Sequence, residues 1–150
     1  VDYSADRAAA GRLGRQRMLR RPDGPTYHVV IDELAIRRAT APPEVLRAQL
    51  LHMAATVNGS PKMTAQVLPV TASIEAYGTP RSAFSIYTFA DPGDPTVVTV
   101  DTVTDDLLLT EVEDVRRYAD LFGRLRQAAM PTEESIELLI EIARDLAVRS

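Results

Sequence analysis

The side chains best placed for chemistry are Asp32 and Glu33, two adjacent carboxylates directly after the nearly all-apolar run of residues 27–31. Such a run predicts a buried strand, and a helix-like pattern follows it. The carboxylates are therefore expected at the carboxyl end of a strand, where open α/β sheets bind ligands or partners. The structural alternative is that Asp32 caps the helix and Glu33 pairs with Arg37 or Arg47.

Asp101 ends a later predicted strand and is a candidate partner for Glu33 in a carboxylate pair. Two carboxylates held close together can perform general acid–base catalysis. No activated nucleophile accompanies them in the sequence. We therefore predict that the chain is not an enzyme, and a hydrolase-like activity is the weakest of the alternatives.

Arg47 and Gln49 lie two positions apart on a predicted helix, so their side chains diverge by roughly 200°. They cannot both face one pocket. Arg47 is read either as a structural ion-pair partner or as part of a binding site. Tyr77 and Tyr87 are the aromatic candidates for lining an effector pocket with the strand-end acids. The predicted ligand- or partner-binding set is Asp32, Glu33, Arg47, Tyr77, Tyr87 and Asp101.

Metal and cofactor chemistry has little support in the sequence. Cysteine is absent, and the two histidines, His28 and His52, are far apart without a neighbouring ligand pattern. We predict no metal and no cofactor, and we expect His28 to be packed and hydrogen bonded.

Composition indicates a globular chain of 150 residues with ordinary hydrophobic content and a net charge of −4. No apolar run is long enough to span a membrane, and the lack of cysteine fits a cytoplasmic protein. Residues 1–61 hold nine arginines against six acids, whereas residues 62–150 hold eight basic and fifteen acidic residues. The main body should therefore not attract DNA.

The elements that must position these residues form a mixed α/β (α+β) pattern. An arginine-rich helix is predicted at 4–20, with Ser4 as its cap and a thin apolar stripe, and a Pro-Gly turn follows it. We expect residues 1–21 to be a linker from a missing upstream domain. Residues 22–150 are then expected to form one domain. We expect a four- to five-stranded mixed sheet with a right-handed βαβ unit and an antiparallel meander. Its strands are predicted near 26–32, 63–70, 83–90, 96–102 and 107–109. Pro69 cannot donate to a strand ladder, so the second strand should end or lie at an edge there.

Helices are expected at 33–39 and 43–57, and two more end the chain, the last beginning at Thr132. Both C-terminal helices are expected to pack on the sheet. The last helix is apolar over more than one face. It is therefore either a central core helix or a partner interface.

Taken in order, these pieces resemble a domain of unknown function that follows an N-terminal helix-turn-helix in Xre-type regulators of actinobacteria, often labelled antitoxin-like. The resemblance spans nearly the whole chain. It departs from the family at residues 71–75, where a Gly and often a His are usual, and at Asp101, where Glu is common. The residues that carry it include Arg15-Gln16, Val30-Ile31-Asp32-Glu33, Arg47-Ala48-Gln49-Leu50, Gln66-Val67-Leu68-Pro69, Phe84-Ser85-Ile86, Val98-Thr99-Val100-Asp101, Val115-Arg116-Arg117-Tyr118 and Ser135.

The resemblance implies a non-enzymatic regulatory domain, commonly encoded beside a small partner protein. We expect it to sense a small cognate protein and to signal through the 4–20 helix. DNA would be contacted only through the missing N-terminal domain, and a homodimer is compatible with the sequence. The main alternative is a small-molecule effector domain.

Overall fold

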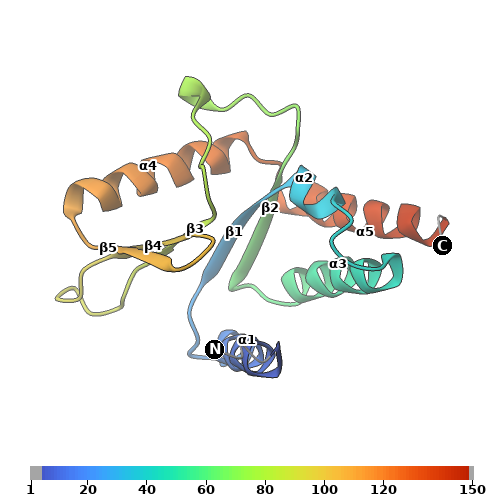
Figure 1. Cartoon of the computed structure of the whole chain (residues 1–150), viewed down its shortest axis with the longest axis horizontal. Helices are drawn as coiled ribbons and strands as arrows, with labels where there is room; N and C mark the ends of the chain where they lie inside the picture. The colour runs from blue at the N-terminus through green and yellow to red at the C-terminus, as the bar shows by residue number, and fades with distance from the viewer. Residues whose placement is uncertain (1–4, 149–150) are drawn as a thin grey trace. The chain divides into compact units, whose positions relative to one another are not determined.

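The computed structural model describes the backbone of residues 5–148 and the side chains of residues 9–148 (Figure 1). It has the predicted mixed α+β class. The helices are α1 (Ala5–Leu19), α2 (Glu33–Arg37), α3 (Pro43–Asn58), α4 (Val112–Ala128) and α5 (Thr132–Val148), with a short 3-10 turn η1 (Glu75–Tyr77). The strands are β1 (Tyr27–Asp32), β2 (Met63–Leu68), β3 (Phe84–Tyr87), β4 (Val97–Asp101) and β5 (Asp106–Leu109).

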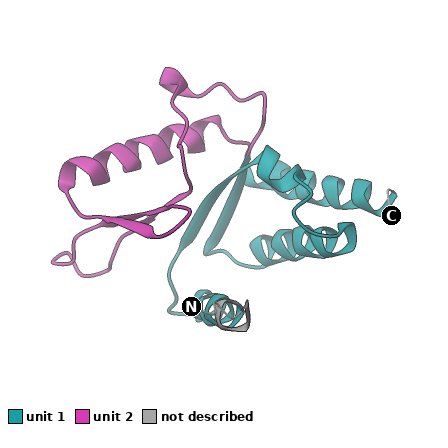
Figure 2. Cartoon of the chain, in the orientation of Figure 1, with its two compact units in different colours: residues 1–67, 131–150 teal, residues 68–130 magenta. Residues whose placement is uncertain are grey.

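The chain divides into two compact units, which the sequence did not predict (Figure 2). Unit 1 comprises residues 1–67 and 131–150, and unit 2 comprises residues 68–130. The strands divide in the same way, into a parallel pair β1-β2 and an antiparallel sheet β3-β4-β5. Pro69 lacks the N–H that a further ladder bond would need, so β2 ends at Leu68, as expected, and does not continue into the meander.

Unit 1 contains the predicted βαβ unit, in which α2 and α3 connect the parallel strands. The strand β1 was expected to be buried on both faces, but Val29, Val30 and Ile31 are only half-buried. The reason is that the sheet has two strands, so β1 is an edge strand. His28 is hydrogen bonded as predicted, because its Nε2 lies 2.7 Å from Oε1 of Gln66 on β2.

The last helix, α5, is a core helix of unit 1. It runs beside α3, where Leu50 and Ala54 are buried. The buried residues of α5 follow the spacing of one helical face, and they are Ser135, Leu139, Ile142 and Ala143. Of the two interpretations left open by the sequence, the structure therefore supports the core helix.

One buried hydroxyl joins α5 to β2. Ser135 is 0% exposed, and its Oγ accepts a hydrogen bond of 2.9 Å from the backbone N–H of Val67. The same hydroxyl donates to the carbonyl of Pro131 at 2.9 Å. A hydroxyl can serve as donor and acceptor at once, so Ser135 satisfies a buried strand amide that would otherwise lack a partner.

Unit 2 is the three-stranded antiparallel sheet with α4 on one face. Phe84 pairs with Val100, and Val100 with Leu107, so these side chains share that face. The ring of Phe84 meets the ring of Tyr118 on α4 edge-on, with centroids 4.9 Å apart. Thus α4 packs on the sheet as predicted, whereas α5 packs chiefly on α3.

The arginine-rich helix α1 forms, but its predicted apolar stripe does not pack. Leu13 and Met18 are more than half exposed, and among the described side chains of the helix, which begin at residue 9, only Leu19 is partly covered. Five residues separate Leu13 from Met18, which turns the second side chain about 140° from the first, so the two cannot share one buried face. The proposed cap, Ser4, lies outside the described residues.

We predict that Ser135→Ala destabilises the protein by about 1–3 kcal/mol, because it leaves the Val67 N–H buried without an acceptor. Urea unfolding followed by circular dichroism measures the change. Ser73→Ala removes the same atom from an exposed loop and should change stability by less than about 0.5 kcal/mol. Equal effects of the two substitutions would contradict this role for Ser135.

Candidate functional site

The Asp32-Glu33 corner is built as a helix start. The carboxylate of Asp32 accepts a hydrogen bond from the N–H of Leu34 at 2.8 Å, which caps α2. Glu33 accepts from Nε of Arg37 at 2.8 Å in an i, i+4 ion pair. These contacts match the structural alternative that the sequence offered for the corner.

Arg47 lies on α3 with its side chain exposed, and the ion pair shown for Glu33 is with Arg37. Gln49, two positions later, is also exposed. The predicted site residues are divided between the two units. Unit 1 contains Asp32, Glu33 and Arg47, whereas unit 2 contains Tyr77, Tyr87 and Asp101.

Tyr87 and Asp101 share one face of the unit 2 sheet, the face opposite to Phe84 and α4. Tyr87 is paired with Val97, and four residues separate Val97 from Asp101 along β4. At about 3.3 Å per residue this places Tyr87 and Asp101 roughly 13 Å apart, at opposite ends of the ladder. They can contact one extended partner, but they cannot enclose one small molecule between them.

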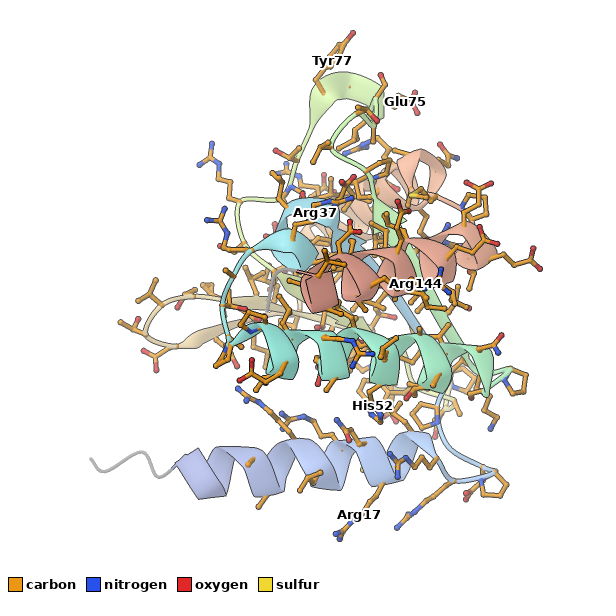
Figure 3. All side chains as sticks on the ribbon, turned by 90° about the vertical axis from the view of Figure 1, so that its right-hand side faces the viewer. Arg17, Arg37, His52, Glu75, Tyr77 and Arg144 are labelled. Atoms are coloured by element: carbon orange, nitrogen blue, oxygen red, sulfur yellow. The ribbon has the colours of Figure 1, made fainter. Side chains whose placement is uncertain are left out.

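Tyr77 is displayed by a strained turn. Ala76 and Tyr77 have φ of 60° and 53°, which are left-handed values that cost energy in residues other than glycine. The Tyr77 side chain is 90% exposed and projects from the end of η1 (Figure 3). The strain therefore holds an aromatic ring in solvent, where it gains nothing from burial.

A hollow of about 360 Å³ lies between η1 and α4 in unit 2. Ala76, Ala119 and Gly123 contribute small side chains to it, and a Cβ built on Gly123 would meet no atom within 4 Å. The polar residues that line it are Glu75, Asp120, Arg124 and Gln127. Among the described residues, the Nε–H of Arg124 is buried without a hydrogen-bond partner. A buried guanidinium donor of this kind is suited to a carboxylate or another anionic acceptor.

Sequence reasoning missed this hollow. Its available signal was Gly123, a glycine in the middle of a helix, which costs up to about 1 kcal/mol relative to alanine. The contribution of η1 had no comparable signal, because nothing in residues 71–82 predicts a turn lying beside α4.

Besides the hollow, unit 2 has a surface that combines acidic side chains with exposed apolar side chains. Residues 82–115 contain eight acids and no Lys, Arg or His. Acidic and exposed apolar side chains occur together on the β4-β5 hairpin, because β5 is an edge strand of its sheet and two of its leucines, Leu107 and Leu108, are exposed. We call the following residues the acidic hairpin surface: Asp101, Val103, Asp105, Asp106 and Leu108.

Two features of the acidic hairpin surface lower the stability of the folded chain. Asp101 and Asp106 are directly paired across the ladder, and like charges in that position repel. Val103 at the hairpin tip is fully exposed and Leu108 is 63% exposed. An edge strand with exposed apolar side chains is a ready site for pairing with another chain.

Within residues 5–148, no group of three or more His, Asp or Glu side chains is arranged to hold a metal ion. Over the same range, no helix combines the length and apolar character that crossing a lipid bilayer requires.

If the corner serves the fold, Asp32→Ala should cost about 0.5–2 kcal/mol of stability through loss of the α2 cap. Asp32→Asn keeps a capping oxygen and should stay within a few tenths of a kcal/mol of the parent. Thermal unfolding of both variants tests this expectation. A similar loss in both would show that the negative charge, rather than the cap, is what the corner needs.

Comparison with known proteins supplies a family but no named relative. No curated protein and no solved structure matches the chain. Residues 2–141 match a family model described as a domain of unknown function (DUF5753). Because that match covers nearly the whole sequence, the chain belongs to the DUF5753 family.

Proposed function

We propose that this chain is a non-enzymatic regulatory domain of a cytoplasmic helix-turn-helix regulator, and that it binds a small cognate protein through the acidic hairpin surface. The observation that carries the proposal is the exposed edge strand β5, where apolar side chains lie among uncompensated acids. The family resemblance supports the regulatory context and the small partner. The proposed DNA-binding part lies upstream of these 150 residues.

The chemistry of the surface specifies the partner. A strand that adds to β5 gains main-chain hydrogen bonds along the edge, and its apolar side chains can cover Leu108. Arg or Lys side chains of the partner would relieve the repulsion between Asp101 and Asp106. The partner is therefore a basic protein with an extended apolar segment.

The role of the acidic hairpin surface can be tested with the small protein encoded beside the gene, using isothermal titration calorimetry. Leu108→Ser should weaken binding about tenfold or more, as expected for a central apolar contact. Leu34→Ser makes the same change on α2, where Leu34 is 55% exposed, and should leave binding unchanged. Absence of binding, or equal weakening by both substitutions, would contradict the proposal.

Removing one charge from the acidic hairpin surface should weaken binding but raise the stability of the free domain. Asp106→Asn should slow association and reduce its dependence on salt, because it removes part of the attraction for a basic partner. The same change should raise the stability of the free domain by a few tenths of a kcal/mol up to about 1 kcal/mol, since it removes the repulsion from Asp101. Stopped-flow association and urea unfolding measure the two effects. A variant that binds normally while gaining stability would remove the charge argument.

A second candidate function is the binding of a small effector in the hollow beside α4. The buried, unpartnered Nε–H of Arg124 favours it, together with the volume of the hollow. Arg124 would hold a carboxylate of the effector, while Glu75 or Asp120 would face a cationic group. Arg124 and Gly123 then become the residues that fix ligand size.

Gly123→Ala should stabilise the protein by about 0.5–1 kcal/mol, because alanine is the better helix former and the added Cβ has open space. Gly123→Leu should fill the hollow and abolish any thermal shift produced by a panel of amino acids and small carboxylates. Gly14→Ala, on α1, should leave such a shift unchanged. A shift that survives Gly123→Leu would place the effector elsewhere.

A further inference from the structure

The helix α1 is an element that the fold of unit 1 does not use for packing. All its described side chains are exposed except Leu19, which is half-buried. It also contains Gly11 and Gly14, each of which weakens a helix by up to about 1 kcal/mol relative to alanine. No buried face among its described residues explains why this segment is present.

What α1 does present is uncompensated positive charge. Residues 7–22 contain no Asp or Glu, and the structure gives its described arginines no ion pair. We use the name arginine surface of α1 for the five exposed arginines of α1 and of the turn that follows it, which are Arg12, Arg15, Arg17, Arg20 and Arg21. These side chains surround the helix and do not share one face, since Arg15 and Arg17 diverge by about 200°. Arg17, for example, points away from α3 into solvent (Figure 3). Neighbouring like charges on a helix are destabilising, so this concentration of charge carries a further cost.

The base of α1 is held to unit 1 by the only lysine of the chain. The Nζ of Lys62 donates to the carbonyl of Pro22 at 2.5 Å and to that of Gly24 at 2.9 Å. Both carbonyls lie in the turn between α1 and β1. The arginine surface is therefore joined to β1 through a turn with a defined conformation.

The side chains of α1 indicate which kind of polyanion this helix can bind. Interfacial helices that bind acidic membranes need one continuous apolar face, and Leu13 and Met18 point about 140° apart. Single-stranded nucleic acid is bound by stacking on aromatic side chains, and α1 has none. The phosphate backbone of a duplex needs neither feature, since it is bound by guanidinium charge alone.

We infer that α1 is a sequence-independent phosphate-contacting helix, which binds the backbone of double-stranded DNA through the arginine surface. This adds to the proposed function, because it assigns a DNA contact to these 150 residues themselves. It does not depend on the hairpin surface or on the hollow. The eight acids of residues 82–115 confine the attraction to α1, since that part of the chain repels phosphates.

The test uses the 150-residue chain and a fluorescein-labelled 24-base-pair duplex of arbitrary sequence, with anisotropy measured from about 25 to 150 mM salt. Each phosphate contact contributes about 0.9 to the slope of log K against log salt concentration. The triple change Arg12→Gln, Arg15→Gln and Arg17→Gln should reduce that slope by roughly one to two, because side chains on opposite sides of the helix cannot all reach the phosphate backbone at once. We expect at least tenfold weaker binding at the lowest salt concentration.

The matched control removes the same charge elsewhere. Arg81→Gln, Arg116→Gln and Arg144→Gln replace three exposed arginines outside α1, and binding should change less than threefold. Circular dichroism of both triple variants verifies that each is folded. Three results would overturn the inference: no duplex binding by the parent chain at 25 mM salt, equal losses in the two triples, or tighter binding to a single strand or to anionic vesicles than to the duplex.

Discussion

The position of α5 on β2, on which the core of unit 1 is built, is fixed by one hydrogen-bonded hydroxyl, that of Ser135. The segment that follows β2 leaves unit 1 for 63 residues before the chain returns as α5. The return is fixed where Ser135 accepts from Val67 and donates to Pro131, in a place with no access to water. Since an unsatisfied buried amide costs about 1–3 kcal/mol, the contact specifies the position of α5 on β2 as well as stabilising it. The apolar face of α5 then covers α3, and the core follows from that alignment.

The sequence predicted the elements well because their signals are local. Periodicity identified α3, α4 and α5, the Asp32 cap defined the start of α2, and Pro69 marked the end of β2. The division into two sheets was not predicted, because strand pairing depends on contacts between distant residues that one sequence does not reveal. For the same reason β1 was expected to be central, although its apolar run occupies an edge.

The candidate site residues were harder to predict, for a related physical reason. Asp32 and Glu33 were selected because carboxylates at a strand end often bind ligands, but caps and i, i+4 pairs need the same residue types. The residue types alone therefore cannot distinguish a ligand-binding role from a structural role. The features that distinguish unit 2 are instead violations of local rules: left-handed Ala76 and Tyr77, a mid-helix Gly123, and Asp101 opposite Asp106. Each costs stability without a visible return inside the domain, which is the pattern expected of functional surfaces.

Positive and negative charges are separated along the sequence, and this separation gives the losses in stability a common interpretation. A net charge of −4 would repel DNA weakly if it were spread evenly, but here the arginines of α1 form one region and the acids of residues 82–115 another. Because salt screens exposed charges over about 10 Å or less, an exposed charge acts mainly on its immediate surroundings. Under the two proposals made above, the acidic hairpin surface would attract a basic protein and the arginines of α1 would attract phosphates. If the two regions were mixed, each would neutralise the other, and the chain would bind neither partner well.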